Sequence, residues 1–303
     1  MVSGTRFSII ITCYNQCDFI RCAVDSALSQ YYPEREIIVV DDGSCDRSTE
    51  ILQKYGNSIQ LVRFSKNRGA IEARNEGATR AEGEFLVFLD GDDLFMPWAL
   101  NVYERIVAER KPKIMFSKLL TFEGDIPLVQ DVPQNIDFLE YECLMAKDRS
   151  VFISASSFVI DRQAFWDAGG WSRGIFYMDG YDLAMKLGYS GHLIVISSPA
   201  TGLYRIHAGN SIHTVPPFLQ MAHHLMGKEK AGEYPGGRNS RSERYAWLGG
   251  VLFFWITRAW RVGLYASALR LAASGWLMIL AAIVRRSIAL IKGRHPIENI
   301  GLW

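Results

Sequence analysis

Cysteine is scarce in this sequence, and no two cysteines form a Cys-x-x-Cys pair. The chain has 303 residues and only five cysteines, an odd number. Zinc sites depend on closely spaced cysteines and disulfide-stapled secreted domains on paired ones, so neither is expected. Free thiols favour a reducing compartment, and we predict that the protein is cytoplasmic.

Long uncharged apolar runs are also missing. The first apolar run, the three isoleucines at 9–11, is far too short for a signal peptide. The longest uncharged stretches of the C-terminal part are 245–257 and 271–284. Both are shorter than the roughly 20 apolar residues that cross a bilayer. We therefore predict no membrane-spanning helix.

The chain as a whole has no excess of one sign of charge. Lys and Arg number 33 and Asp and Glu 32, a formal charge of +1, which argues against a nucleic-acid binder. This balance hides an asymmetry: residues 241–303 hold nine Lys or Arg and two Glu, a net charge of +7, so the rest carries −6. An acidic body with a basic tail predicts two functional parts.

Short apolar strands alternate with helices over the first two hundred residues. The apolar, β-branched runs that predict buried strands lie at 7–12, 36–40, 61–64 and 85–89. The segments between them that predict helices are 18–30, 48–55 and 70–81. Strands and helices that alternate at this spacing form βαβ units around a parallel sheet. The predicted fold class is therefore α/β, a Rossmann-like, mostly parallel sheet flanked by helices, with a C-terminal helical extension.

Three segments are expected along the chain. Residues 1–215 would form the catalytic domain, and 216–241, rich in Gly, Pro, His and charge, would be a linker or mobile loop. Residues 242–303 would form a helical tail in which Trp, Phe and Tyr interleave with Arg. Such a tail either packs on the domain as an ordinary hairpin or anchors it to a membrane interface. The basic charge and the tryptophans favour peripheral membrane contact, at the inner face of the plasma membrane.

Carboxylates cluster directly after the predicted strand at 85–89. The run is Asp-Gly-Asp-Asp, from Asp90 to Asp93. On an extended backbone Asp90 and Asp92 point the same way. Two oxygen ligands on one side suit Mg²⁺ or Mn²⁺ bridging a diphosphate. By itself, however, such a run is more often a polar turn.

Two further predicted strands end in polar residues. The strand at 36–40 runs into DDGS at 41–44, and the strand at 7–12 runs into TCYN at 12–15. Each run alone is explained by a strand-end turn or a helix cap. Open α/β sheets bind ligands at the carboxyl edge of their strands. Three polar strand ends together therefore predict a ligand site at that edge.

The order and spacing of these motifs resemble a family 2 glycosyltransferase with the GT-A fold. The matching segments are IITCYNQ at 10–16, EIIVVDDGSCD at 36–46, the run from 67 to 93, MDGYDLAMKLGYSG at 178–191 and YRIHAGNSI at 204–212. The resemblance implies an inverting, metal-dependent enzyme that moves one sugar from a UDP- or dTDP-sugar onto an oligosaccharide or lipid-linked acceptor in cell-surface glycan synthesis. It is similar to the non-processive members, because the chain has no Gln-x-x-Arg-Trp run.

The resemblance also implies a donor pocket and a metal site. The residues that would bind the nucleotide-sugar are Thr12, Tyr14, Asp41, Asn67, Gly69, Arg74 and Asp90. Asp92 would be the principal ligand of Mn²⁺ or Mg²⁺, and Asp90 would meet the ribose or the metal. His207 would approach the metal and the diphosphate, although an exposed loop histidine is an equal alternative.

The expected catalytic base departs from the family pattern. Similar enzymes have Glu-Asp, one residue, then Asp-Leu, which places Gly180 where the base usually stands. Asp179 is the favoured base and Asp182 the second candidate, while a helix-capping pair is the plain alternative. The missing acid also motivates a different function, a catalytically silent GT-A domain that binds nucleotide-sugar as a scaffold or partner subunit.

A nucleotidyltransferase would share the sheet and the carboxylates. Such an enzyme should show a Gly-rich phosphate loop with Lys or Arg after its first strand, and TCYNQCDF at 12–19 is no such loop. Glycosyl transfer is therefore favoured over nucleotidyl transfer.

Overall fold

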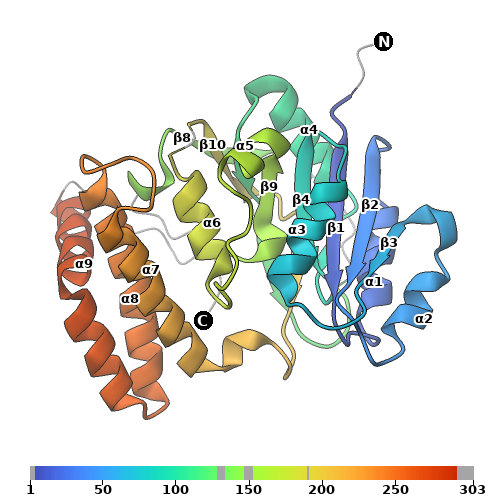
Figure 1. The fold of residues 1–303 in the computed structure, drawn as a ribbon. Coiled ribbons are helices and arrows are strands. Elements are labelled where there is room, and N and C mark those ends of the chain that lie inside the picture. Colours follow the sequence, from blue (N-terminus) through green and yellow to red (C-terminus); the bar gives the residue numbers. More distant parts are fainter. Residues whose placement is uncertain (1–3, 128–133, 147–152, 190, 292–303) are drawn as a thin grey trace.

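An eight-stranded sheet forms the centre of the computed structural model, which describes residues 4–127, 134–146, 153–189 and 191–291 (Figure 1). Its strand order is β3-β2-β1-β4-β9-β6-β10-β8. The strands are β1 (Phe7–Cys13), β2 (Arg35–Asp41), β3 (Gln60–Arg63), β4 (Phe85–Asp90), β6 (Ile114–Phe116), β8 (Asp137–Tyr141), β9 (Phe158–Asp161) and β10 (Leu193–Ser198). The α-helices are α1 (Ile20–Leu28), α2 (Ser48–Gln53), α3 (Ala70–Arg80), α4 (Ala99–Arg110), α5 (Arg162–Asp167), α6 (Asp179–Leu187), α7 (Val215–Ala231), α8 (Arg241–Arg261) and α9 (Tyr265–Ile291). The 3₁₀ turns are η1 (Gly56–Ser58), η2 (Leu144–Ala146), η3 (Ala155–Ser157) and η4 (Ser211–His213).

The first four strands of the sheet are parallel, which confirms the fold class expected from the sequence. β1 pairs in parallel with both β2 and β4, and β2 pairs with β3. The register places Thr12 opposite Asp90 and Cys13 opposite Asp41. The polar ends of these strands therefore meet at one edge of the sheet, as the carboxyl ends of parallel strands must.

The other half of the sheet is mixed. β9 runs antiparallel to both β4 and β6, and β8 runs antiparallel to β10. A small second sheet has the order β5-β11-β7, formed by β5 (Leu94–Phe95), β11 (Gly202–Arg205) and β7 (Leu119–Phe122). Because β11 pairs with β5, which follows the carboxylates of β4 by a few residues, the chain around residue 207 returns to the same sheet edge.

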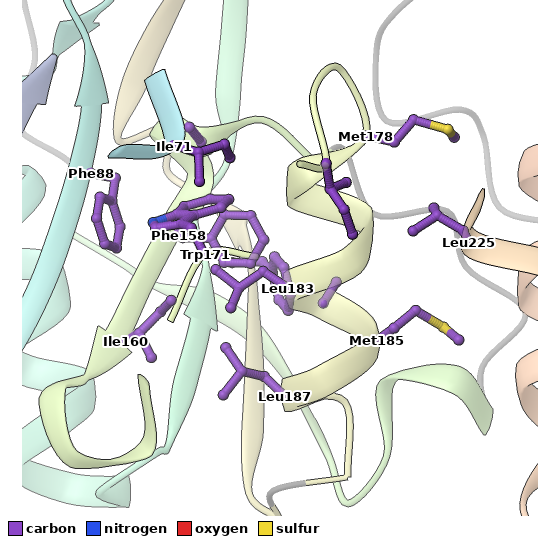
Figure 2. Packing of buried hydrophobic residues seen from close by; sticks show 14 of the residues in the cluster. Ile71, Phe88, Phe158, Ile160, Trp171, Met178, Leu183, Met185, Leu187 and Leu225 are labelled. Carbon is purple, nitrogen blue, oxygen red and sulfur yellow. The ribbon is translucent and has the colours of Figure 1, made fainter. Parts of the chain in front are cut away.

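Alternate residues of the central strands point into two apolar layers, one on each face of the sheet. Ile10 packs on the face covered by α3, α5 and α6, and Ile9 and Ile11 pack on the face covered by α1 and α4. Both faces are covered, so the strands are continuous apolar runs with no exposed side. Figure 2 shows Leu183 and Leu187 of α6 on the side of Phe158 and Ile160.

The expected linker at 216–241 is mostly a helix, so that prediction was wrong. α7 covers residues 215–231, and its two prolines stand in the first turn, where a missing N–H costs nothing. Its buried side chains repeat at helical spacing: Val215, Phe218, Leu219, Ala222, Leu225, Met226 and Glu229. Composition alone suggested a loop, whereas the apolar period marks a helix that packs on the domain.

Helices α7, α8 and α9 form what we call the C-terminal helical unit, residues 215–291. In Figure 1 it stands beyond α6, at the opposite end of the molecule from β2 and β3. α8 and α9 form a hairpin so close that a Cβ added at Gly249 would lie 1.9 Å from the carbonyl oxygen of Met278. The end of the expected tail, residues 292–303, lies outside the described residues.

Helix α9 is longer and more apolar than its charge-free runs suggested. It has 27 residues, and its most apolar 18-residue window has a mean hydropathy of 1.8. By length and composition it could cross a membrane, a test that buried helices of soluble proteins also pass. Only 22% of that window is buried in the structure. Short uninterrupted runs were therefore no ground for excluding a spanning helix, because such a helix tolerates an occasional arginine.

Candidate active site

A buried arginine connects the end of β4 to the start of α6. Arg74 of α3 donates to Asp90 Oδ1 over 2.7 Å and also forms an ion pair with Asp179 Oδ2. Burial by itself lowers the pKa of Arg74, but the charges of Asp90 and Asp179 outweigh that effect and raise it. The structure thus brings together three residues predicted from the sequence, two of them 105 positions apart in the chain.

A carboxylate and an imidazole pair lie next to this bridge. His207 Nε2 lies 2.9 Å from Asp92 Oδ2, and the imidazole also packs on Phe19, with ring centroids 4.6 Å apart. The pKa of Asp92 is raised by burial and by the charge of Asp90, against the lowering effect of His207. His207 is therefore no isolated loop histidine, and the two expected metal ligands are neighbours.

The third carboxylate of the run is structural. Asp93 is buried and accepts hydrogen bonds from Ser156 Oγ (2.6 Å) and the Arg205 backbone N–H (3.0 Å). Burial, followed by the charges of Asp92 and Asp90, holds the pKa of Asp93 well above its usual range. Arg205 also donates to the Asp92 carbonyl oxygen over 3.0 Å and lies over the Phe19 ring. Sequence reasoning missed Arg205, although it precedes His207 in the YRIH segment by two residues.

The donor set fits a hard divalent cation that takes further ligands from a bound diphosphate. In the described part of the chain, no three His, Cys, Asp or Glu side chains are grouped so that they could hold a metal by themselves. Asp92 and His207 supply one oxygen and one nitrogen donor, and Asp90 adds negative charge beside them. Mn²⁺ and Mg²⁺ commonly bind through one or two carboxylates plus substrate phosphates.

The two aspartates that end β2 point to different partners. Asp41 is fully buried, and its carboxylate accepts hydrogen bonds from the Ser44 N–H (2.9 Å) and the Thr49 hydroxyl (2.5 Å). It therefore holds the turn into α2, and its contact with a nucleoside stays a prediction. Alternation along the strand sends its neighbour to the other side.

Asp42 is the residue that shapes the next wall of the site. Its carboxylate accepts the backbone N–H groups of Arg68 (2.6 Å) and Gly69 (2.8 Å). Gly69 has φ 94°, a left-handed conformation that favours glycine. Asn67 lies exposed in the same loop. Asp42 was missed because two adjacent identical residues give no sequence signal as to which one faces the loop.

The end of β1 contributes backbone more than side chain. The Thr12 carbonyl oxygen accepts the Gly91 N–H over 2.9 Å, which ties the Asp-Gly-Asp-Asp run to β1. A Cβ at Gly91 would lie 2.7 Å from that oxygen, so this close approach requires glycine. Thr12 is nearly buried, whereas Tyr14 is 45% exposed and free to meet a ligand.

The two candidate bases have different surroundings. Asp179 is the first residue of α6 and makes no cap, since Met178 occupies the N-cap position. The Asp182 carboxylate is fully buried and bonded to Lys228 and Tyr234 of the C-terminal helical unit. Asp179 is therefore the acid that reaches the strand ends, and the capping alternative is wrong.

Gly180, which replaces the usual acid, has no room for a side chain. A Cβ there would lie 2.7 Å from Ile153 Cγ2 and 3.5 Å from the Phe158 ring. Ile153 thus occupies the space that an acidic side chain would need, and Asp179 supplies a carboxylate next to Arg74 instead. A carboxylate therefore stands one residue before the position where similar enzymes have the base.

Comparison with known proteins gives the same family. The family described as glycosyl transferase family 2 matches residues 8–168, more than half of the chain. The cholesterol galactosyltransferase of Borreliella burgdorferi is 35% identical over 112 residues, which cover 36% of this chain and 31% of that protein. The chain spans between 31% and 61% of the length of the first three curated relatives that it matches.

Solved structures agree on the fold. S. aureus TarS 1-349 in complex with UDP-GlcNAc has a TM-score of 0.69 at 18% identity, covering 89% of this chain and 79% of that one. The mannosyltransferase PcManGT from Pyrobaculum calidifontis, in complex with GDP-Man and Mn²⁺, has a TM-score of 0.56 at 18% identity, covering 93% and 87%. With the family match over more than half its length, this chain belongs to glycosyl transferase family 2 and is a glycosyltransferase with the GT-A fold.

Proposed function

We propose that the enzyme transfers a single sugar, with inversion, from a UDP- or dTDP-sugar to a hydroxyl of an oligosaccharide or lipid-linked acceptor in cell-surface glycan synthesis. The Arg74 bridge is the observation that carries this proposal, because it puts the Asp179 carboxylate beside the Asp90 to Asp92 run. One solved neighbour binds UDP-GlcNAc, and a family relative is named a galactosyltransferase, which supports a nucleotide-sugar donor here.

The reaction needs one proton acceptor and one stabilised leaving group. The acceptor oxygen would attack the anomeric carbon from the face opposite the diphosphate, while the bond from that carbon to the diphosphate oxygen breaks. Arg74 engages Asp179 Oδ2, so Oδ1 would receive the hydroxyl proton. A positioned general base is typically worth about 10²–10⁴-fold in rate.

Asp92 and His207 would hold the divalent cation on the donor side. When bound, such an ion neutralises the negative charge that develops on the departing diphosphate. The hydrogen bond of 2.9 Å between the two side chains and the packing of the imidazole on Phe19 hold both groups in place before the donor arrives.

The donor is tested with a panel of UDP-, dTDP- and GDP-sugars incubated with Mn²⁺, with release of the nucleoside diphosphate as the readout. We expect release from UDP- or dTDP-sugars and its loss with EDTA. Asp92→Asn should weaken UDP binding in Mn²⁺ by about 10- to 100-fold, and the exposed Asp167→Asn should not. Equal UDP affinity of the Asp92 variant and the wild type, measured by calorimetry with Mn²⁺, would overturn the metal assignment.

We also propose that the α8–α9 hairpin contacts a membrane from the cytoplasmic side. Its large apolar side chains that are exposed include Phe253, Phe254, Trp260, Tyr265, Leu269, Trp276, Leu277, Leu280, Ile283, Val284 and Ile288. The exposed arginines of the hairpin are Arg261, Arg270 and Arg286. Apolar and aromatic side chains with basic neighbours fit an anionic bilayer surface. Flotation with phosphatidylserine vesicles should carry the full chain; a chain that stays soluble without detergent and ignores these vesicles contradicts the proposal.

A further inference from the structure

Both candidate acids stand in the first turn of α6, and each has its own partners. Asp179 meets Arg74 on the sheet side, and Asp182, three residues later, meets the C-terminal helical unit. We propose that Asp182 is a positioning residue: through Lys228 and Tyr234, the C-terminal helical unit holds the first turn of α6 and so aims Asp179 at the acceptor hydroxyl. This inference rests on the proposed role of Asp179 as the base.

The Asp182 contacts are short and fully enclosed. Its Oδ1 accepts a hydrogen bond from Lys228 Nζ (2.5 Å) and another from Tyr234 Oη (2.7 Å). Lys186, one turn further along α6, lies 3.9 Å from Oδ2. Burial lowers the pKa of Lys186, an effect that Asp182 partly offsets. One buried carboxylate thus joins α6, α7 and the turn that follows α7.

The packing of α6 on α7 does not require the ion pair between Asp182 and Lys228. Figure 2 shows Met178 and Met185 on the side of α6 that faces Leu225 of α7, so apolar contact is already present. A buried ion pair adds little net stability over apolar packing, because both charges lose their water. What two directional bonds to one oxygen add is a fixed rotation of α6 about its axis, which apolar contacts alone do not set.

A second contact reaches the chain just before Asp179. Tyr177 has φ 67°, a strained backbone for a residue with a side chain, and its ring packs on Phe218 of α7 at 5.2 Å between centroids. Phe218 in turn stacks on Trp255 of α8, at 3.9 Å and 15° between the ring planes. The C-terminal helical unit therefore contacts the chain on both sides of the candidate base.

The turn that presents Tyr234 is itself held firmly. Arg244 of α8 is buried and pairs with the buried Glu229 of α7 over 2.6 Å. The same guanidinium donates to the carbonyl oxygens of Pro235 (2.7 Å) and Gly237 (2.8 Å). These bonds fix the turn that carries Tyr234 within the C-terminal helical unit. The hydrogen bond from Tyr234 to Asp182 can therefore restrain the rotation of α6.

The test is a double-mutant cycle between Tyr234→Phe and Asp179→Asn in the full chain. Tyr234→Phe removes one hydroxyl and keeps the Lys228 pair, so the fold should survive. The readout is Mn²⁺-dependent hydrolysis of the donor that the panel identifies, with water as the acceptor. We expect Tyr234→Phe to slow hydrolysis by about 10- to 100-fold, the range of a misplaced catalytic group, with UDP affinity unchanged, and to have no further effect in the Asp179→Asn background.

A matched control is at hand. Tyr31→Phe removes an exposed tyrosine hydroxyl far from α6 in the sequence. It should not change the rate. Amide hydrogen exchange gives a second readout that needs no donor: peptides covering 176–187 should exchange faster in Tyr234→Phe and at the wild-type rate in Tyr31→Phe.

The outcomes separate the two claims. If Asp179→Asn hydrolyses the donor at the wild-type rate, the assignment of Asp179 as the base is overturned, whatever the rate of Tyr234→Phe. An impaired Asp179→Asn with a fully active Tyr234→Phe, or with effects that add, overturns the positioning role alone. Unchanged exchange over 176–187 in Tyr234→Phe overturns it as well.

Discussion

The two sides of the proposed active site are built in different ways. On the donor side, Thr12 and Asp90 come from the ends of neighbouring parallel strands that the register places opposite each other. On the other side, Asp179 depends on Arg74 from α3 and on a helix packed against the C-terminal helical unit. The donor side thus follows from strand order, whereas the acceptor side is assembled from elements distant in the chain.

If Asp179 is the base, as proposed, this difference would allow the motif to have Gly180 while an acid remains close to the strand ends. The direction of a carboxylate at the end of a strand is set by the alternation of that strand, so moving it by one residue would turn it to the other face of the sheet. A helix such as α6 can be turned by its partners on both sides, so the acid can move by one residue if those partners hold the new orientation. Ile153 in the space beside Gly180 is consistent with such a shift.

Arg74→Met is expected to have the largest effect, because Arg74 joins the two sides. The variant leaves Asp90 and Asp179 without their shared partner. We expect loss of donor hydrolysis and a fall in the free energy of unfolding near the lower end of about 3–5 kcal/mol, since both carboxylates are partly exposed. Arg173→Met is the control: it breaks an exposed pair with Glu72 worth about 0–1 kcal/mol. Urea denaturation measures both, and equal shifts would contradict a special role for Arg74.

Asp179→Asn should affect only the acceptor side. The substitution is nearly isosteric, so we expect hydrolysis and transfer to fall by about 10²–10⁴-fold while UDP binding persists. The rate of Asp182→Asn should fall less, because its amide oxygen can still accept hydrogen bonds from Lys228 and Tyr234. Steady-state rates and UDP calorimetry on both variants decide the order. If Asp179→Asn keeps its activity, Asp179 is not the base.

Two neighbouring glycines of α8 test how tightly the C-terminal helical unit is packed. A methyl group at Gly249 would collide with the backbone of α9, whereas nothing lies within 4 Å of one at Gly250. Gly249→Ala should therefore destabilise by about 1–3 kcal/mol, and Gly250→Ala should stabilise by up to about 1 kcal/mol through helix propensity. Thermal unfolding measures the pair. A Gly249→Ala variant as stable as the wild type would mean that the hairpin is loosely packed.

Charge reversal on the hairpin should produce the smallest effect. Arg261→Glu and Arg286→Glu should each weaken binding to phosphatidylserine vesicles at moderate salt. The expected loss is at least about 1 kcal/mol of binding free energy, the contribution of one basic residue near an anionic surface. UDP affinity should not change. The exposed Lys54→Glu, before the turn to β3, serves as the control. Vesicle binding that responds equally to all three variants would show a general charge effect and no oriented contact.

Local sequence was enough to determine the four parallel strands of the sheet and the carboxylates that follow β4. The four parallel strands were expected from their apolar runs. Each run coincides with one strand and is followed by a turn that the local sequence also shows. Asp90 and Asp92 could be located because strand alternation is a property of the chain itself. The contact between Asp92 and His207 needed more, namely the order of motifs along the whole family pattern.

Tertiary structure alone decided the rest. The partners of Asp41 and Asp42 and the separate partners of Asp179 and Asp182 depend on contacts that strand and helix periodicity does not specify. Arg74 lies 105 residues from Asp179, and Lys228 lies 46 residues from Asp182. No local pattern encodes such pairs, because which face a helix turns toward its neighbours is set by the packing of the whole chain.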